Sequence, residues 1–203
     1  VKQLYQMKAN FWHKDFVWDG TSFSSDQDII VFVEKNYPEL NVFFKEWLSD
    51  SGKILIKTSG STGVPKKIAL SREHMINSAR ATAKFFNLEA GSKVLLCLPL
   101  GFIAGRMMLV RSMVMGWQLD VIESSSKLMI PKNITYDFSA MVPLQLYNSL
   151  DELKKIKTLI VGGGEVSEAI VNQIDSLKTK IYATYGMTET ITHIALSPLN
   201  KAA

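Results

Sequence analysis

Cysteine is almost absent from this sequence: Cys97 is the only one in 203 residues. No disulfide can form within the chain, which fits a reducing compartment and makes the cytoplasm the expected location. No apolar stretch reaches about 18 uninterrupted residues, so a transmembrane helix is not expected. The N-terminus lacks the pattern of a secretory signal peptide. Cys97 lies within an apolar run, where a small buried hydrophobic residue is the expected role.

Other chemical signatures are missing as well. The net charge is +4, but no run of basic residues occurs, so nucleic-acid binding is not expected. His13, His74 and His193 are isolated from one another and from cysteine, which excludes a sequence-local metal motif. No Gly-x-Ser-x-Gly turn is present, so hydrolase chemistry of that type is not supported.

What the chain does have is a regular alternation of apolar runs and helical periodicity. Its hydrophobic content of 47% and charged content of 21% are those of an ordinary folded protein. Helices are expected at residues 26–35, 40–48, 71–90, 104–115, 144–153 and 167–177. Ser71 and Ser167 would be N-caps, and Gly91 and Gly116 would end two of these helices. Strands are expected at residues 53–57, 67–70, 93–99, 117–123, 134–142, 158–161 and 180–184.

This order predicts an α/β fold with a mainly parallel sheet flanked by helices. Residues 1–52 are expected to form an N-terminal segment of helices and loops that packs on the main body. Residues 53–203 are expected to form the main α/β domain. Ligands of such sheets bind beyond the carboxyl ends of the strands, so the turns after the strands are the places to search for a site.

The richest of these segments is the loop at residues 58–66, between two short strands. Hydroxyl groups, glycines and one ammonium group are the donors that hold phosphate, and glycine lets backbone N–H groups turn toward an anion. The loop is not a P-loop, because Gly63 and Lys66 are separated by two residues. A plain hydroxyl-rich turn remains the alternative. The candidate phosphate-binding residues are Thr58, Ser59, Gly60, Ser61, Thr62, Gly63 and Lys66.

Two further turns follow buried strands. Three glycines at residues 162–164 would let a flat ligand approach bare backbone, although a tight strand-to-helix turn would have the same composition. Thr188 and Glu189 place a hydroxyl and a carboxylate side by side, and a carboxylate suits Mg²⁺. Tyr185 could stack on a nucleobase. A Tyr-Gly turn followed by a capping threonine is the alternative for this segment.

Taken together, residues 58–66, 162–164 and 185–189 resemble the adenylate-forming superfamily of acyl-CoA synthetases, adenylation domains and luciferases. Residues 98–105 and the pair Arg111 and Ser112 resemble the o-succinylbenzoate–CoA ligases in particular. The resemblance implies an acid–CoA ligase of menaquinone biosynthesis. It would use ATP and Mg²⁺ to form an acyl-adenylate, and coenzyme A would then displace AMP.

The resemblance also implies roles for individual residues. Lys66, Thr188 and Glu189 would be catalytic, with Glu189 as the Mg²⁺ ligand. The loop at residues 58–66 would bind the β- and γ-phosphates. Further ATP-binding residues would be Gly162, Gly163, Gly164, Glu165, Tyr185, Gly186, Met187 and Thr188. The acid would meet Phe102, Gly105, Arg106, Arg111 and His193.

Two departures from the family pattern and two arginines qualify these assignments. Lys67 follows Lys66 where the family usually has glycine, and Phe102 stands where many relatives carry a histidine. Arg106 and Arg111 lie in an otherwise apolar helix, where a charge needs a partner. Either could pair with a second carboxylate of the substrate, or it could reach the surface or meet an acidic side chain.

The sequence ends at Ala203, before the family's ribose-binding aspartate and its small C-terminal domain. We therefore expect this chain to be the N-terminal portion of a longer enzyme and to be catalytically incomplete by itself. Two alternatives stay open: another acyl- or aryl-CoA synthetase, and a non-catalytic nucleotide-binding scaffold that forms a homodimer.

Overall fold

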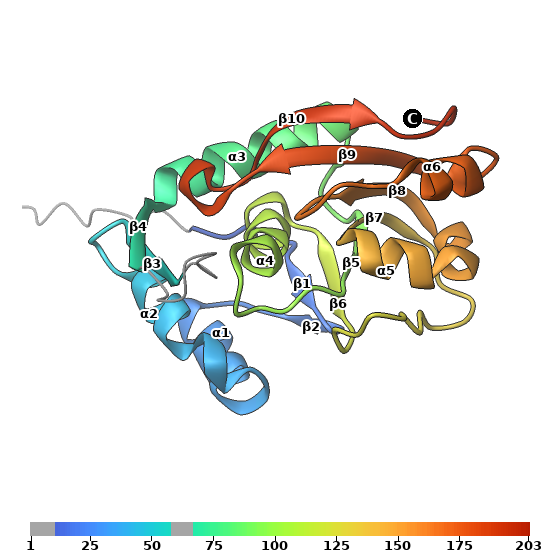
Figure 1. Ribbon diagram of the computed structural model, residues 1–203. Helices are drawn as coiled ribbons and strands as arrows, with labels where there is room; N and C mark the ends of the chain where they lie inside the picture. Colours follow the sequence, from blue (N-terminus) through green and yellow to red (C-terminus); the bar gives the residue numbers. More distant parts are fainter. Residues whose placement is uncertain (1–10, 58–66) are drawn as a thin grey trace, which may run out of the picture.

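The computed structural model describes residues 11–57 and 67–203. An eight-stranded sheet forms the centre, with strand order β10-β9-β8-β7-β5-β6-β1-β2 (Figure 1). The six inner strands are parallel, and the two edge strands β2 and β10 are antiparallel to their neighbours. The strands are β1 (Val17–Trp18), β2 (Thr21–Ser22), β5 (Lys93–Leu96), β6 (Gln118–Val121), β7 (Tyr136–Met141), β8 (Ile156–Val161), β9 (Lys180–Gly186) and β10 (His193–Pro198).

Helices cover both faces of this sheet, as the sequence predicts. They are α1 (Asp26–Asn36), α2 (Asn41–Leu48), α3 (Arg72–Phe86), α4 (Ile103–Met115), α5 (Pro143–Asn148) and α6 (Glu168–Ile174). Short 3₁₀ helices are η1 (Pro38–Leu40), η2 (Leu150–Lys155) and η3 (Thr188–Thr190). None of the helices in the described part of the chain has the length and apolar character that a membrane crossing requires.

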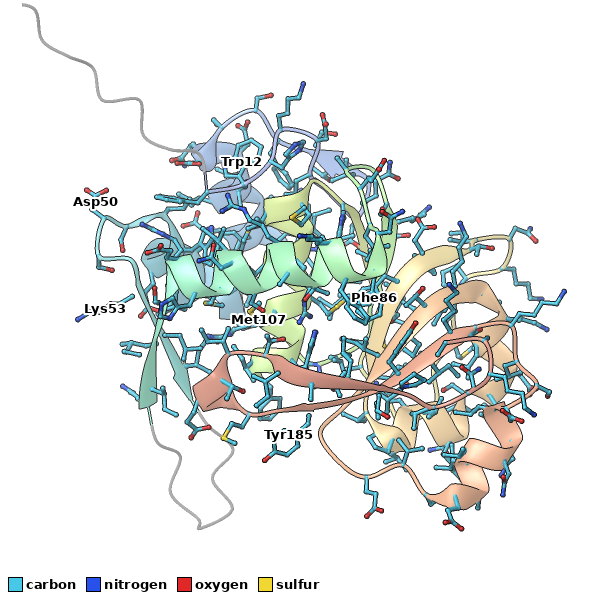
Figure 2. All side chains as sticks on the ribbon, turned by 90° about the horizontal axis from the view of Figure 1, so that it is seen from above. Trp12, Asp50, Lys53, Phe86, Met107 and Tyr185 are labelled. Carbon is cyan, nitrogen blue, oxygen red and sulfur yellow. The ribbon has the colours of Figure 1, made fainter. Side chains whose placement is uncertain are left out.

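Strand β5 shows how the two layers arise from alternation. Val94 and Leu96 are fully buried in one apolar cluster, which includes Met75 of α3 and Met108 of α4. Leu95 points to the other face, into a second cluster formed with α5 and α6. Side chains of a strand alternate between faces, so a strand covered on both sides is apolar throughout. Figure 2 shows α3 lying along the hairpin of β9 and β10, and α3 also packs against α4.

The ends of two helices show where local rules held and where they did not. Ser71 is the N-cap of α3, and its Oγ accepts a hydrogen bond from the His74 N–H at 3.4 Å. Gly116 ends α4 with a left-handed φ of 71°, as predicted. Gly91 does not end α3: the helix stops at Phe86, and Asn87 takes the left-handed conformation with φ 52°. Asparagine tolerates this conformation better than most residues, so the helix ends before the glycine.

Five other expected elements, two helices and three strands, need correction. The helix expected at residues 144–153 is α5 followed by the separate 3₁₀ helix η2, with the break at Ser149. Ser167 is at the N-cap position of α6, but its side chain makes no capping hydrogen bond. Strands β5, β6 and β7 end earlier than expected, at Leu96, Val121 and Met141. The residues that follow these strands leave the sheet and lie at the carboxyl ends of its parallel strands.

Strands β3 (Lys53–Lys57) and β4 (Lys67–Ser71) form a separate two-stranded hairpin, in line with the two strands expected around residues 58–66. The N-terminal segment contributes an edge of the large sheet, since β1 pairs in parallel with β6. Its connection to β2 is a tight turn at Asp19 and Gly20, both with positive φ. The Asp19 side chain also accepts a hydrogen bond from the Val121 N–H at 2.8 Å, which ties this turn to the end of β6.

Candidate active site

The expected site residues gather at the end of the sheet formed by the carboxyl ends of the parallel strands, which we call the carboxyl edge. Met141 of β7 pairs with Val161 of β8, which in turn pairs with Ala183 of β9. The segments that continue these strands therefore emerge side by side. This edge is the place where a parallel α/β sheet binds its ligands.

The glycine turn at residues 162–164 lies next to the end of β9. Gly163 has a φ of 82°, a conformation that favours glycine. A Cβ on Gly162 would lie 2.3 Å from Thr184 Oγ1, and that hydroxyl donates to the Val161 carbonyl at 3.1 Å. Glycine is thus needed for the close contact of the two strands. Glu165, Gly163 and Gly164 are exposed, so the outer side of the turn is accessible to a ligand.

Tyr185 projects from the end of β9, and its side chain is 63% exposed (Figure 2). An aromatic ring of this size beside exposed glycines provides a surface on which a nucleobase can stack. Gly186 follows, and a Cβ there would lie 2.4 Å from the Thr192 carbonyl oxygen. Its role in the fold is to let β9 and β10 approach closely. Met187 is exposed.

Glu189 and Thr188 are presented by the 3₁₀ helix η3. The Glu189 side chain is exposed, and Thr188 is half-buried and lines a cavity. Among residues 11–57 and 67–203, no group of three or more His, Cys, Asp or Glu side chains could hold a metal ion. A single exposed carboxylate nevertheless fits Mg²⁺, which usually takes one or two protein carboxylates and completes its shell with water and phosphate oxygens.

The hairpin that flanks the hydroxyl-rich loop lies beside η3, because β4 contacts that helix (Figure 1). The strands around residues 58–66 therefore approach the segment that carries Thr188 and Glu189. The loop itself, with the predicted phosphate-binding residues, lies outside the described residues. Those residues are Thr58, Ser59, Gly60, Ser61, Thr62, Gly63 and Lys66.

A cavity of about 500 Å³ opens between the glycine turn, η3 and the start of α4. Phe102 and Gly105, both expected from the sequence, line it, and Phe102 is 50% exposed. A Cβ on Gly105 would lie 2.3 Å from the Pro99 carbonyl oxygen, so glycine lets α4 start directly against this turn. The remaining lining residues are Leu98, Pro99, Ile103, Ala104, Ser124, Ser125, Ser126, Val142, Leu144, Gln145, Gly163 and Thr188.

Sequence reasoning missed one wall of this cavity. Three consecutive serines, at residues 124–126, follow the carboxyl end of β6 and reach the same edge as the glycine turns. A run of small hydroxyl residues just after a buried parallel strand is a signal that could have identified them. Gln145 gave no such signal, because a glutamine in a short helix usually faces solvent.

Arg111 on α4 is 2% exposed and has no acidic partner in the described part of the chain. Its Nε donates to Thr82 Oγ1 at 3.2 Å and its Nη2 to Thr192 Oγ1 at 2.5 Å. Burial lowers the pKa of the guanidinium from 12.5 to about 10, so it stays charged at neutral pH. Among the described residues the guanidinium meets no carboxylate, and it does not reach the surface; its charge is held there by hydroxyl groups and a sulfur atom.

Arg106 has a different environment. Its Nε donates to the Leu100 carbonyl at 3.0 Å, and its guanidinium lies 5.5 Å from the ring centre of Phe43. Burial lowers its pKa, and the nearby Glu46 carboxylate opposes that shift. These contacts join α4 to the N-terminal helices, so they explain this charge through packing alone.

His193 begins β10 and is half-buried beside Arg111. Burial, followed by the Arg111 charge, lowers the pKa of the imidazole from 6.5 to about 4. The ring is therefore neutral at neutral pH. Its Nδ1 lies 3.3 Å from the hydroxyl of Thr192, the same hydroxyl that accepts from Arg111. Arg111, Thr192 and His193 form one continuous polar group, which we call the Arg111 niche.

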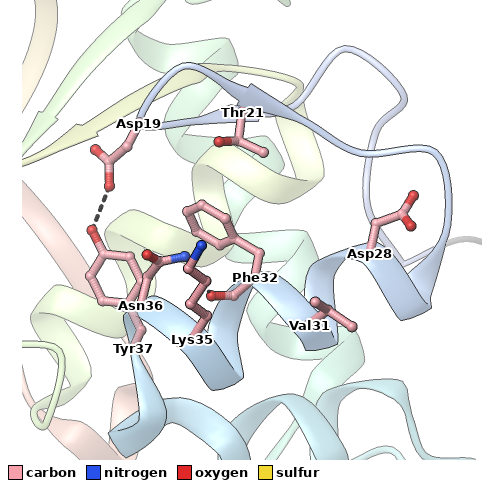
Figure 3. A pocket seen from close by; sticks show the side chains of 8 residues that line it. All are labelled: Asp19, Thr21, Asp28, Val31, Phe32, Lys35, Asn36 and Tyr37. Atoms are coloured by element: carbon pink, nitrogen blue, oxygen red, sulfur yellow. Dashed lines mark hydrogen bonds between the residues drawn. The ribbon is translucent and has the colours of Figure 1, made fainter.

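A larger and more open pocket of about 790 Å³ lies over α1 and the turn between β1 and β2 (Figure 3). Its acidic groups are already engaged: Asp19 accepts from the Tyr37 hydroxyl at 2.5 Å, and Asp28 accepts from the Ser24 N–H at 2.9 Å. Burial and the Asp19 carboxylate raise the pKa of the Tyr37 phenol. The pocket shares no residue with the glycine-bearing strand ends, so we place the candidate site at the smaller cavity.

Comparison with known proteins agrees with this geometry. The profile of the AMP-binding enzyme family matches residues 45–203, so the chain belongs to that family. A 2-succinylbenzoate–CoA ligase of Geobacillus is 26% identical over 170 residues, which are 78% of this chain and 34% of that protein. The Haemophilus influenzae ligase of the same name is 25% identical over 194 residues, or 92% of this chain and 38% of that protein. The chain thus spans about a third of the length of these relatives.

Solved structures show the same fold. An acyl-CoA synthetase (AMP-forming)/AMP-acid ligase II-like protein from Dyadobacter fermentans is 37% identical with a TM-score of 0.74, over 81% of this chain and 50% of that one. The o-succinylbenzoate CoA synthetase of Bacillus subtilis, solved with its acyl-adenylate intermediate, has a TM-score of 0.61 at 22% identity, over 71% of this chain and 31% of that one. The arrangement is that of the N-terminal domain of adenylate-forming enzymes.

Proposed function

We propose that this chain carries the nucleotide- and acid-binding part of an ATP-dependent acid–CoA ligase. The observation that supports it best is the meeting of the glycine turn, Tyr185 and η3 at one sheet edge, beside the cavity lined by Phe102. A base-stacking ring, exposed glycine backbone and a metal-binding carboxylate at the same end of the sheet suit a nucleotide whose α-phosphate faces this cavity. The hairpin at β3 and β4 would add the triphosphate-binding loop.

The proposed reaction has two steps. A carboxylate oxygen of the acid attacks the α-phosphorus of ATP, a new P–O bond forms, and pyrophosphate leaves with the electron pair of the broken bond. The thiolate of coenzyme A then attacks the acyl carbon, and AMP leaves with the former carboxylate oxygen. Glu189 would hold Mg²⁺, and Thr188 and Lys66 would contact the phosphates; the role of these groups is to position and neutralise charge.

The Arg111 niche supports an acid with a second negative group. A fully buried guanidinium without an anionic partner is costly, and a carboxylate from a ligand would supply that partner through two parallel hydrogen bonds. The hydroxyl of Ser78, one turn before Thr82, is also buried and finds no hydrogen-bond partner among the described residues. We therefore propose an aromatic dicarboxylate, with o-succinylbenzoate of menaquinone biosynthesis as the best candidate.

The cavity beside Phe102 favours a different kind of ligand. No charged side chain lines it in the described part of the chain, so the charged end of a dicarboxylate would be unpaired there. Serine hydroxyls on one wall and apolar side chains on the others suit a narrow, neutral arm that carries amide groups. We assign this cavity to the thiol arm of coenzyme A and the Arg111 niche to the acid.

Two alternatives differ in what they bind. Another acyl- or aryl-CoA synthetase would prefer a monocarboxylic acid and would be indifferent to the charge of Arg111. A nucleotide-binding scaffold, including one that forms a homodimer, would bind nucleotide but release no pyrophosphate. The buried Arg111, which has no carboxylate partner among the described residues, favours the dicarboxylate ligase over both.

Calorimetric titration of the protein with ATP·Mg²⁺ and with AMP tests the nucleotide site. We expect saturable binding of both ligands, with Glu189→Gln weakening ATP·Mg²⁺ more than AMP because only ATP brings the metal. Lys66→Ala should also weaken ATP, since it removes a phosphate-binding cation. A Glu34→Gln variant, in which an exposed carboxylate of α1 is neutralised, is the matched control and should bind normally. Equal affinity of the Glu189→Gln and control proteins would contradict the assignment.

A further inference from the structure

The three serines lie in the long connection between β6 and β7. Side chains on one side of the α5–η2 segment hold this connection in place. Three side chains spaced four and three residues apart, Gln145, Ser149 and Glu152, each bond its backbone. Gln145 Nε2 donates to the Ser125 carbonyl at 3.1 Å. Ser149 Oγ and Glu152 Oε2 accept N–H groups of residues 128 and 130, each at 2.9 Å. The connection is therefore fixed along its length.

Gln145 differs from the other two because it reaches the cavity. Its side chain is 3% exposed, and all of its polar atoms are used. Besides Ser125, Nε2 donates to the Cys97 carbonyl at 2.8 Å, and Oε1 accepts from the Val142 N–H at 3.2 Å. These three backbone groups belong to the segments that follow β5, β6 and β7. One amide thus sets the spacing of three separate walls.

The amide group suits this task better than other side chains. It provides two donors and an acceptor in one plane, which matches two carbonyls and one N–H. Glutamate would lose both donors, and an apolar side chain would leave all three backbone groups unsatisfied in a buried place. A shift of the serine wall would follow in either case, because these bonds are what joins it to the neighbouring strand ends.

We propose that Gln145 is a positioning residue that holds the Ser124–Ser126 wall at the distance required by the thiol arm of coenzyme A. This inference rests on the proposed ligase function. The glutamine would not contact the reacting atoms; it would act through the wall that it holds. None of the three bonds ends on a residue of the Arg111 niche or of the turns at residues 162–164 and 185–189, so a substitution should act mainly on one substrate.

The test compares the two half-reactions in the protein at the full length of its gene product. In Gln145→Met, the KM for coenzyme A should rise about five- to tenfold in thioester formation, the effect of losing a hydrogen bond or two. The KM for the acid and for ATP, measured by pyrophosphate release without coenzyme A, should change less than about twofold. Gln145→Glu keeps one of the three bonds and should show the same selective rise.

Ser149→Ala is the matched control. It removes the tie to residue 128, which does not line the cavity, and should lower the melting temperature without a change in the KM for coenzyme A. If the Gln145 variants do not fold, Ser124→Val at an exposed position narrows the same wall and should raise the KM for coenzyme A alone. An unchanged KM for coenzyme A, or an equal rise for the acid, would overturn the inference. Absence of pyrophosphate release by the wild-type protein would instead overturn the ligase proposal.

Discussion

Replacing Arg111 by methionine should stabilise the fold and at the same time weaken the binding of the acid. Burial lowers the arginine pKa from 12.5 to about 10, and at 1.36 kcal/mol per unit this corresponds to a cost of about 3 kcal/mol for keeping the charge. The side chain is 2% exposed, so solvent does not reduce this cost appreciably. Losing two hydrogen bonds to threonine hydroxyls offsets roughly 2 kcal/mol. We expect a net gain of about 1 kcal/mol in unfolding free energy.

The effect on the acid should have the opposite sign. A bidentate pair between guanidinium and carboxylate in a dry site contributes about 3 kcal/mol, which corresponds to a KM on the order of 100-fold higher in its absence. Arg111→Lys keeps the buried charge but loses the planar fork, so it should bring no stability gain and an intermediate KM. Methionine is similar in length to arginine but uncharged, so the comparison of Arg111→Met with the wild type measures mainly the effect of the charge.

Urea unfolding followed by tryptophan fluorescence gives the free energy of unfolding. The rate of pyrophosphate release at increasing concentrations of the acid substrate gives the KM for the acid. Arg80→Met, at an exposed position of α3, is the matched control and should alter neither. A loss of more than about 1 kcal/mol in Arg111→Met, together with an unchanged KM for the acid, would refute the argument. Arg111 would then be a structural residue whose buried charge is stabilised sufficiently by its hydroxyl partners.

Two further predictions concern His193 and Gly105. As the pH falls from 6.5 to about 4, His193 binds a proton in the unfolded chain but not in the folded one, where its pKa is lowered. The free energy of unfolding should therefore fall by about 1–2 kcal/mol over this range, after allowance for partial exposure. Urea unfolding at several pH values should show a flatter profile for His193→Gln. Gly105→Ala puts a Cβ 2.3 Å from the Pro99 carbonyl oxygen and should destabilise the protein by about 1–3 kcal/mol in the same assay, whereas Gly101→Ala, with nothing within 4 Å, should be neutral. A stable Gly105→Ala protein would show that α4 can move away from this turn at little cost.

The class of fold could be predicted from the sequence because its signals are local and repeated. Alternating strands and helices, a serine cap at residue 71 and a stop at Gly116 each depend on a few neighbouring residues. The break at Ser149 could not be predicted, because it accompanies a hydrogen bond from residue 128 in a different segment. The prediction failed at Asn87 for a different, local reason: asparagine also takes the left-handed conformation, and it ends α3 four residues before the expected glycine.

In the candidate site, too, some residues have a local sequence signal and others have none. Glycine-bearing turns at strand ends carry their own signal, and parallel topology brings them together. The surroundings of Arg111 carry none: its hydroxyl partners Thr82 and Thr192 lie 29 and 81 residues away in sequence. Gln145 was missed for a related reason, since two of its three partners lie on other segments. Residues that act by joining distant segments have no local pattern by which to be recognised.

The pairing of β1 with β6 has a consequence for how the protein comes to be folded. Asp19, at the end of β1, bonds Val121, which lies 102 residues further along the chain. During synthesis the N-terminal strand therefore has no place in the sheet until β6 has left the ribosome. Contacts that close so long a loop form late and slowly. In the interval Phe16 and Trp18, both fully buried in the finished structure, are exposed to proteases and chaperones.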